Sequence, residues 1–177
     1  MTTPDLVLDE FMPFRLSFTS NLVSDTIAST YHTLFALSIP EWRLVAVVAE
    51  AGGDGITQVE IGGRTRMDKV TVSRAAIALA GRGLLARRAN ARDRRSHLLV
   101  LTDAGKALYA AVAPKALELE RRIFAQFAPD ELAGFVAMLR RIDTAALVLT
   151  PNHGPERELT GDRAASTIGR QHKGRGE

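Results

Sequence analysis

The chain contains no cysteine among its 177 residues, and this absence excludes three kinds of chemistry. Disulfide bonds, thiolate metal ligands and redox sensing through thiols all need that side chain. Histidine is also scarce, with four residues of which no two have the spacing of a metal-binding pair. The chain also shows no nucleophile–base pair and no glycine-rich phosphate loop. We therefore expect no metal, no cofactor and no enzymatic activity.

Long apolar runs are missing as well. No stretch of about 18 apolar residues occurs, so we expect no membrane-spanning helix and no membrane partner. The N-terminal sequence MTTPDLVLDEF has neither the basic nor the apolar region of a signal peptide, which favours a cytoplasmic protein. Hydrophobic residues nevertheless make up 46% of the chain, enough for a globular core.

Positive charge is concentrated in one stretch of the sequence. Residues 64–97 hold ten basic and two acidic side chains, a local charge of +8, whereas the whole chain carries only +3. The remaining residues therefore sum to −5. A basic centre between acidic flanks indicates that this stretch forms the surface for a polyanion.

The periodicity of apolar residues predicts long helices on both sides of the basic stretch. One apolar stripe marks a helix over residues 11–37, with members at Leu16, Val23, Ile27, Tyr31 and Leu34. Pro40 suits the first turn of a second helix. Two more helices follow Thr102 and Pro129, and we expect Pro114 to bend the earlier of these two.

Between these helices the sequence predicts two shorter helices and a β-hairpin. Thr57 and Glu60 match a capping box that starts a short helix. Asp68 is the expected N-cap of a better-formed helix that ends near Arg82. Residues 84–88 and 97–101 have the pattern of two strands joined by an arginine-rich turn. This order of elements is typical of a winged helix-turn-helix.

Four short motifs occur in order along this region, namely Pro40-Glu41-Trp42-Arg43, Arg82-Gly83-Leu84, Asp93-Arg94-Arg95-Ser96 and Leu101-Thr102-Asp103-Ala104-Gly105. Together they resemble the MarR family of transcriptional regulators, and the resemblance covers roughly residues 11–149. It implies a homodimer in which the first helix and the last two helices of each subunit interlock. Two winged modules would then reach successive major grooves of a pseudo-palindromic operator.

The fold class we expect is therefore mainly α with a small β-hairpin wing, a winged helix-turn-helix module embedded in a helical dimerisation frame. The amphipathic stripes agree with a dimer, because a single winged module cannot cover three long helices. We divide the chain into an N-terminal dimerisation helix (1–37), the DNA-binding module (38–102), C-terminal dimerisation helices (103–150) and a disordered tail (151–177).

The helix that follows Asp68 is the expected recognition helix, with DNA-contacting side chains at Lys69, Thr71, Ser73 and Arg74. Arg74 can donate two hydrogen bonds to guanine, and a phosphate contact is the alternative. For Val70 and Ile77 we expect core positions, with contacts to thymine methyl groups as the alternative. Phosphate contacts are expected in and after the preceding short helix, at Thr57, Gln58, Arg64 and Arg66.

The arginine-rich turn is the second expected DNA contact, through Arg92, Arg94 and Arg95. The resemblance implies that Arg95 enters the minor groove, where the negative potential favours arginine, and that Asp93 braces the wing through an ion pair. Arg92 and Arg94 would then hold phosphates, and the alternative is a solvated charged turn. Arg87 and Arg88 alternate on a strand, so we expect only one of them to face DNA.

Many members of the family release DNA when a small ligand binds between the dimerisation helices and the winged module. The resemblance thus also implies an effector, an aromatic or carboxylate compound. Candidate contacts are Arg15, Tyr31, His32, Trp42 and Arg43. For Tyr31 and Trp42 the alternative is core packing, and for His32 it is a hydrogen-bonded surface position.

The expected function is a transcriptional regulator that binds double-stranded DNA sequence-specifically, as a ligand-responsive repressor. The alternative is a dimeric winged-helix module whose arginines meet an acidic protein. The concentration of arginines at one hairpin turn favours DNA.

Overall fold

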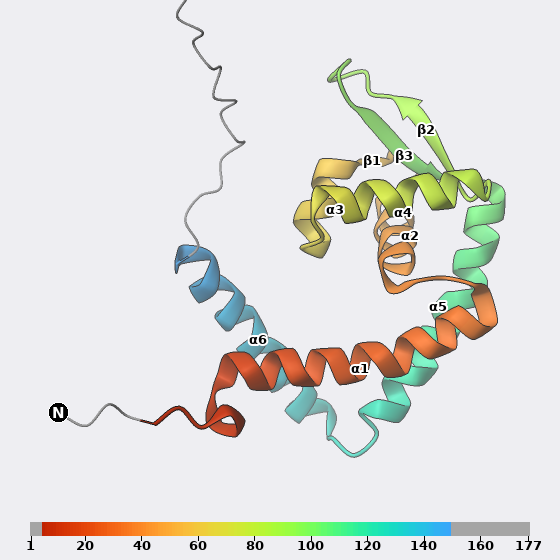
Figure 1. Ribbon diagram of the computed structural model, residues 1–177. Coiled ribbons are helices and arrows are strands. Elements are labelled where there is room, and N and C mark those ends of the chain that lie inside the picture. The colour runs from red at the N-terminus through yellow and green to blue at the C-terminus, as the bar shows by residue number, and fades with distance from the viewer. Residues whose placement is uncertain (1–4, 150–177) are drawn as a thin grey trace, which may run out of the picture. The chain divides into compact units, whose positions relative to one another are not determined.

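The structure is a computed structural model that describes residues 5–149, so the tail expected at 151–177 lies outside the described residues. The chain divides into two compact units, Met1–Gln126 and Phe127–Glu177, and each is treated by itself (Figure 1). The elements of the first unit are η1 (Leu8–Glu10), α1 (Met12–Phe35), α2 (Ile39–Ala51), η2 (Gly52–Asp54), β1 (Ile56–Thr57), α3 (Gln58–Thr65), α4 (Lys69–Gly81), β2 (Leu85–Ala89), β3 (His97–Leu101) and α5 (Asp103–Ile123). This mainly helical architecture with a small sheet confirms the expected winged-helix fold class.

One hydrophobic core holds the first unit together. It is built from α2, α3, α4, α5 and the strands, and its fully buried members include Leu37, Leu44, Val45, Val48, Ile61, Val72, Leu79, Leu99 and Val112. Tyr31 from α1 joins this core at 3% exposure, whereas Leu34 from the same expected stripe is 57% exposed. The core therefore fixes the last turn of α1 against the winged module.

The sheet contains one strand that the sequence pattern did not indicate. Its order is β1-β3-β2, with both neighbours antiparallel to β3. β1 is only two residues long, and its register places Ile56 opposite Leu99 and Thr57 opposite Leu98. Because Thr57 is also the N-cap of α3, this strand joins the start of α3 directly to the wing.

Three helices of the winged module start at side-chain caps. The predicted capping box of Thr57 and Glu60 is present, and Asp68 caps α4 by accepting a hydrogen bond from the Thr71 amide at 2.9 Å. A second capping box, between Ser38 and Glu41, starts α2 and was not predicted. Such caps satisfy amide groups that have no partner within the helix.

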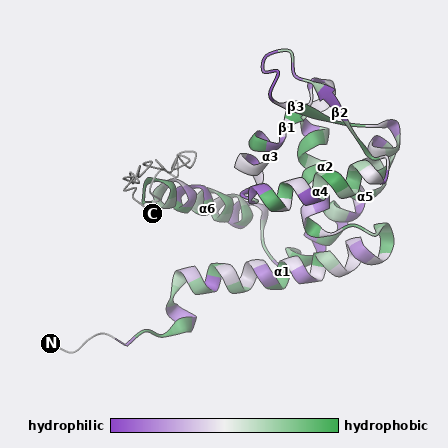
Figure 2. Cartoon of the chain, turned by 45° about the horizontal axis from the view of Figure 1, so that its top comes forward, coloured by the Kyte–Doolittle hydropathy of each residue, from purple (hydrophilic) through white to green (hydrophobic). Residues whose placement is uncertain are grey.

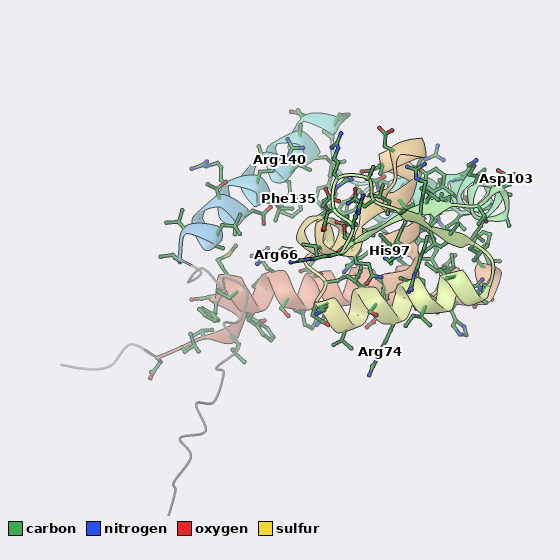
Figure 3. The ribbon with its side chains drawn as sticks, turned by 90° about the horizontal axis from the view of Figure 1, so that it is seen from above. Arg66, Arg74, His97, Asp103, Phe135 and Arg140 are labelled. Carbon is green, nitrogen blue, oxygen red and sulfur yellow. The ribbon has the colours of Figure 1, made fainter. Side chains whose placement is uncertain are left out.

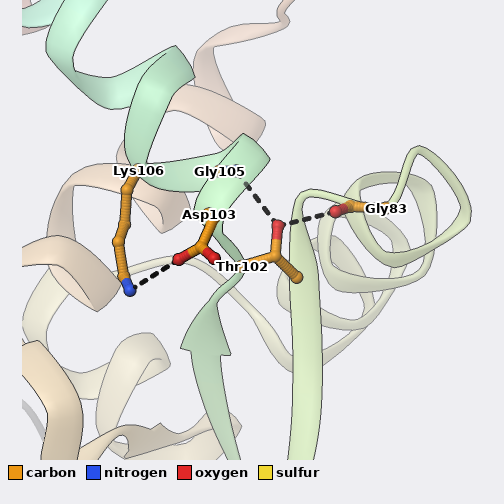
Figure 4. A network of polar contacts seen from close by, with 5 residues as sticks. All are labelled: Gly83, Thr102, Asp103, Gly105 and Lys106. Atoms are coloured by element: carbon orange, nitrogen blue, oxygen red, sulfur yellow. Dashed lines mark hydrogen bonds and ion pairs between the residues drawn. The ribbon is translucent and has the colours of Figure 1, made fainter.

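The junction between β3 and α5 explains the glycine of the LTDAG motif (Figure 4). The Thr102 hydroxyl donates to the Gly83 carbonyl at 2.7 Å and accepts from the Gly105 amide at 3.1 Å. A Cβ atom on Gly105 would overlap the backbone carbonyl oxygen of Leu84. Only glycine therefore allows the first turn of α5 to approach the backbone of Leu84, just before β2, so closely.

α5 continues through Pro114 up to Ile123, so the proline lies inside the helix without ending it. Its buried face is centred on Val112, with Leu108 and Leu119 half-buried. Phe127 follows the end of α5 and is 44% exposed.

The second unit contains α6 (Pro129–Leu149) as its described helix. α6 has no buried residue, and its apolar side chains Phe135, Val136 and Ile142 are 40–43% exposed. Of the helices within residues 5–149, none is both long enough and apolar enough to cross a membrane.

Candidate nucleic-acid interface

The face of α4 opposite the core presents Arg74 to solvent. Val72, Ala75, Ala76 and Leu79 face the core, and the Arg74 side chain extends away from it (Figure 3). Thr71 is half-buried, and its hydroxyl donates to Asp68 Oδ2 at 2.6 Å. These hydrogen bonds hold the pKa of the Asp68 carboxyl below its ordinary value. The hydroxyl proton of Thr71 is therefore used inside the helix cap.

The expectation that Val70 and Ile77 belong to the core is wrong. Their exposed fractions are 57% and 59%, although both are β-branched apolar residues. They lie on the same side of α4 as Arg74, at helical spacings of four and three residues. Sequence periodicity could not place them, because a helix of alternating small and apolar residues offers two possible buried stripes.

The wing is braced by Asp93 through the backbone rather than through the expected ion pair. Asp93 Oδ1 accepts a hydrogen bond from the Arg95 amide at 2.9 Å, and the Asp93 carbonyl accepts from the Ser96 amide at 3.1 Å. Within residues 5–149, no acidic side chain pairs with Asp93's neighbours Arg94 and Arg95. The turn is therefore shaped locally, and its guanidinium groups stay exposed at the hydrophilic tip (Figure 2).

Asn90 closes the base of the same turn. Its Nδ2 donates to Ser96 Oγ at 2.9 Å, and its Oδ1 accepts from the Arg92 amide at 3.0 Å. Both strands of the hairpin are thus tied together immediately below the arginines, which limits how far the tip can bend.

A groove of about 470 Å³ lies between α3, α4 and the wing. It brings together four predicted residues from three elements, namely Thr57, Gln58, Lys69 and Arg95. Arg87 and His97 from the two strands also line it. Three of these side chains are cationic, so the groove is suited to the sugar–phosphate backbone of a nucleic acid.

Arg87 and Arg88 point to different partners, as their alternation predicted. Arg87 lines the groove beside Lys69 and Arg95, whereas Arg88 Nη2 donates to the backbone carbonyl of Asp54. Arg88 thus anchors the wing to the loop after α2, and Arg87 is the member of the pair that faces the groove.

The expected phosphate contacts differ in how free their groups are. The Thr57 amide donates to Glu60 Oε2 at 2.9 Å and its hydroxyl donates to the same oxygen at 2.7 Å, so both groups are used inside the capping box. Arg64 forms an ion pair with Glu50 of α2. Arg66 is exposed at the C-cap of α3 with a φ of 57°. The expected phosphate contacts thus compete with internal partners at Thr57 and Arg64, whereas Arg66 is exposed and Gln58 lines the groove.

The Glu60 carboxylate lies at the N-terminus of α3, close enough to the wing for the charge of Arg92 to affect its pKa. Hydrogen bonds from Thr57 hold the pKa of Glu60 below its ordinary value, and the charge of Arg92 adds to this effect. A carboxylate is favoured at this position because the amides of the first helical turn carry partial positive charge.

Arg82 belongs to the basic stretch by sequence but has a structural role. Its Nη1 donates to the Ala36 carbonyl at 2.9 Å and its Nη2 to the Phe35 carbonyl at 3.1 Å. Ala36, the C-cap of α1, has a left-handed conformation with a φ of 49°. The guanidinium group at the C-terminus of α4 therefore caps the end of α1, where cations are favoured.

The structure does not bring all of the candidate effector residues together. Tyr31 and Trp42 are 5.5 Å apart between ring centroids, and Trp42 stacks on Tyr109 of α5 at 5.8 Å. Burial raises the pKa of the Tyr31 hydroxyl. Arg15 lies near the other end of α1, about 24 Å from Tyr31 at 1.5 Å per residue, and pairs with Asp9.

His32 and Arg43, the other two candidates, are exposed. The structure therefore groups three aromatic rings from α1, α2 and α5 without Arg15, and it adds Tyr109, which the sequence analysis missed. Among residues 5–149, no group of three acidic or histidine side chains is arranged to hold a metal ion.

Comparison with known proteins gives a consistent result. Residues 37–96 match the model of the MarR family. No curated protein sequence matches the chain. Among solved structures, a MarR/EmrR family transcriptional regulator from Acinetobacter sp. ADP1 has 20% identity and a TM-score of 0.73, covering 80% of this chain and 98% of that chain.

Two further solved structures are similar over a comparable length. BpsR of Bordetella bronchiseptica, whose DNA binding is regulated by 6-hydroxynicotinic acid, has 23% identity and a TM-score of 0.71 over 79% of this chain and 98% of that chain. MepR of S. aureus, solved in complex with DNA, has 21% identity and a TM-score of 0.68 over 76% of this chain and 98% of that chain.

Proposed function

Because this chain is a MarR-family winged-helix protein by the match over residues 37–96 and by its fold, we propose that it represses transcription by binding operator DNA as a homodimer. The recognition helix is α4, and the wing between β2 and β3 is the second contact. The operator is pseudo-palindromic, with half-sites about one helical turn apart.

The groove between α3, α4 and the wing is the observation that carries this proposal. Lys69, Arg87 and Arg95 come from three different elements and converge on one cavity. Exposed Arg74 lies on the adjacent face of α4, in position to enter a major groove. Converging cations next to an exposed helix suit a duplex, because phosphates set the register while the helix reads base edges.

The exposed apolar side chains of the long helices support the homodimer. On α1, Phe18 and Leu22 are 49% and 59% exposed, and on α6 the side chain of Met138 is 53% exposed. Apolar surface of this extent is unfavourable in water unless a partner covers it. A second copy of the chain offers the same helices and satisfies both subunits at once.

Ligand response is the finer part of the proposal, and it rests on the aromatic cluster Tyr31–Trp42–Tyr109. The cluster joins α1, α2 and α5, the helices whose relative positions set the separation of two winged modules. A small aromatic or carboxylate compound that inserts beside these rings would favour one arrangement of the helices over another. The residues we assign to this contact are the three rings Tyr31, Trp42 and Tyr109, together with the exposed residues His32 and Arg43.

A binding experiment with the full chain tests the proposal. Duplexes are selected from a random library, and the affinity of the best duplex is measured across a range of salt concentrations. We expect the logarithm of affinity to fall linearly with that of salt, with a slope of about −0.9 per phosphate contact. Arg74→Ala should reduce discrimination between the selected and a scrambled duplex by about 1–3 kcal/mol.

Sedimentation of the same sample measures the assembly, and we expect twice the chain mass of 19.2 kDa. The proposal is wrong if no duplex binds even at low salt. Binding to an acidic protein in place of DNA would favour the winged-helix interaction module instead.

A further inference from the structure

The outward face of α4 is mostly apolar, which is unusual for a helix surface in water. At 100° per residue, Val70, Arg74 and Ile77 lie within about 60° of one another, on the side opposite buried Val72 and Leu79. Val70 is 57% and Ile77 is 59% exposed. The two other exposed positions on this side are Ala78 and Gly81, which bring no polar group.

Polar groups that could read bases are scarce on this face. The Thr71 hydroxyl already donates to Asp68 Oδ2 at 2.6 Å. Lys69 lines the groove toward the wing, and half-buried Ser73 lies on a flank of the helix. Arg74 is thus the single charged side chain at the centre of the outward face. One bidentate arginine specifies about one guanine, which is too little for an operator half-site.

We propose that Val70 and Ile77 read the 5-methyl groups of thymines on the two sides of the guanine contacted by Arg74. The methyl group of thymine is the apolar feature that base pairs present in the major groove, so it is the matching surface for branched aliphatic side chains. This inference rests on the proposed function and adds the residues that set its sequence preference.

The surrounding charge identifies the occupant of this face as DNA rather than an apolar protein surface. Residues 64–97, which include all of α4, β2 and the arginine-rich turn, carry a net charge of +8. Arg74 lies between the two apolar side chains, and an apolar protein partner would have to bury its guanidinium without a counter-charge. A DNA duplex offers phosphates to the surrounding cations and thymine methyl groups to Val70 and Ile77.

The size of the effect follows from the area of one methyl group. Burial of a single methyl changes a binding constant by about three- to fivefold. Two thymines in each half-site of a twofold operator therefore add up to a large difference in affinity, and a single replaced thymine remains measurable.

Replacing thymine by deoxyuridine in the selected duplex isolates this contact, because it removes the methyl group and keeps every hydrogen-bonding group. We expect each replacement next to the guanine to weaken binding by about three- to fivefold. Replacements outside the half-sites should have no effect. The double variant Val70→Ala/Ile77→Ala should bind the thymine and uracil duplexes with equal affinity.

Val59→Ala is the matched control, since Val59 is 85% exposed on α3 and lines the groove toward the wing rather than the outward face of α4. Val59→Ala should keep the wild-type difference in affinity between the thymine and uracil duplexes. Melting temperatures of all variants should match the wild type, because alanine is a better helix former than valine or isoleucine.

Four results would overturn the inference. If the wild type binds both duplexes equally, the inference is wrong while the proposed function stands. The same holds if the double variant still discriminates between the two duplexes. If the double variant sediments as a monomer, this face is a protein interface, and the assignment of α4 as the recognition helix fails together with the inference. If no duplex binds the wild type, the proposed function fails and the inference fails with it.

Discussion

The side chain of Asp93 holds the backbone of Arg95: its Oδ1 accepts a hydrogen bond from the Arg95 amide at 2.9 Å. This contact shapes the turn without using the guanidinium group of Arg95. The resemblance to the MarR family implied that Asp93 braces the wing through an ion pair, and an ion pair with Arg95 would have neutralised the group proposed to enter the minor groove. A backbone brace leaves that charge available.

Two variants of Asp93 separate these possibilities. Asp93→Asn keeps an oxygen at Oδ1 and should retain nearly full DNA affinity, whereas Asp93→Ala loses the acceptor and should bind more weakly. Arg95→Ala should lower affinity by about 10- to 100-fold, since a charge-assisted hydrogen bond is lost. Fluorescence anisotropy on the selected duplex measures all three.

The melting temperature is the control for this series, because the wing tip is exposed and contributes little to the core. It should stay nearly constant for Arg95→Ala. A variant Asp93→Asn that binds as poorly as Asp93→Ala would restore the ion-pair interpretation.

Arg82 should behave as a structural residue although it lies in the basic stretch. Arg82→Ala removes two hydrogen bonds to the Phe35 and Ala36 carbonyls, and we expect a loss of about 1–2 kcal/mol in the free energy of unfolding. Urea titration measures this loss. Arg94→Ala, at the exposed wing tip, is the matched control and should leave stability unchanged.

Arg82→Ala and Arg94→Ala should rank in the opposite order in their effect on the salt dependence of DNA binding. Arg94→Ala should reduce the log–log slope by about 1 if Arg94 holds a phosphate, and Arg82→Ala should leave the slope unchanged. A reduced slope for Arg82→Ala would show that Arg82 contacts DNA and would contradict its assignment as the cap of α1.

Gly105 should not tolerate a side chain. Gly105→Ala places a methyl group against the Leu84 carbonyl, and we expect a destabilisation of about 1–3 kcal/mol by urea or thermal unfolding. In contrast, a Cβ on Gly63 in α3 meets nothing within 4 Å. Gly63→Ala should therefore stabilise the protein by about 0.5–1 kcal/mol. Equal effects for the two substitutions would contradict the close approach at Leu84.

The acid stability of the winged module should depend on two helix caps. The folded-state pKa values of Glu60 and Asp68 lie below their ordinary values of 4.5 and 3.8, because hydrogen bonds from Thr57 and Thr71 favour the charged carboxylates. A depressed folded pKa contributes stability that is present above the unfolded pKa. That stability is lost as the pH falls through the folded pKa.

We therefore expect the melting temperature to fall as the pH drops below about 4.5, the ordinary value for glutamate. The variant Glu60→Gln/Asp68→Asn keeps acceptor oxygens but cannot titrate, so its melting temperature should change less over this range. Circular dichroism melts of both proteins provide the measurement. Parallel pH profiles would exclude these caps as the cause.

Much of the fold could be predicted because its signals are local. Capping at Thr57 and Asp68, the glycine that follows the recognition helix and the alternation of the wing strands each depend on residues within one helical turn or one hairpin. The same local logic found Lys69, Arg74 and Arg95 as exposed cations. Their convergence with Arg87 on one groove needed the tertiary structure.

The errors share a different cause. Val70 and Ile77 were assigned to the core because apolar side chains usually are, and only the packing of Val72 and Ala75 shows which face is buried. Local patterns also could not show that Arg64 pairs with Glu50 or that Arg82 donates a hydrogen bond to Ala36. These partners are 14 and 46 residues away in the sequence, beyond any local pattern.

The two ends of α4 are held by different parts of the fold. Asp68 caps the N-terminus from the residue just before it, while the C-terminus is suspended from α1 through Arg82. The N-terminus of α4 is therefore fixed within the winged module, whereas its C-terminus is attached to the end of α1. A displacement of the end of α1 consequently rotates α4 about its N-terminus at Asp68. Because Ile77 lies further from Asp68 than Val70 does, this rotation moves Ile77 further.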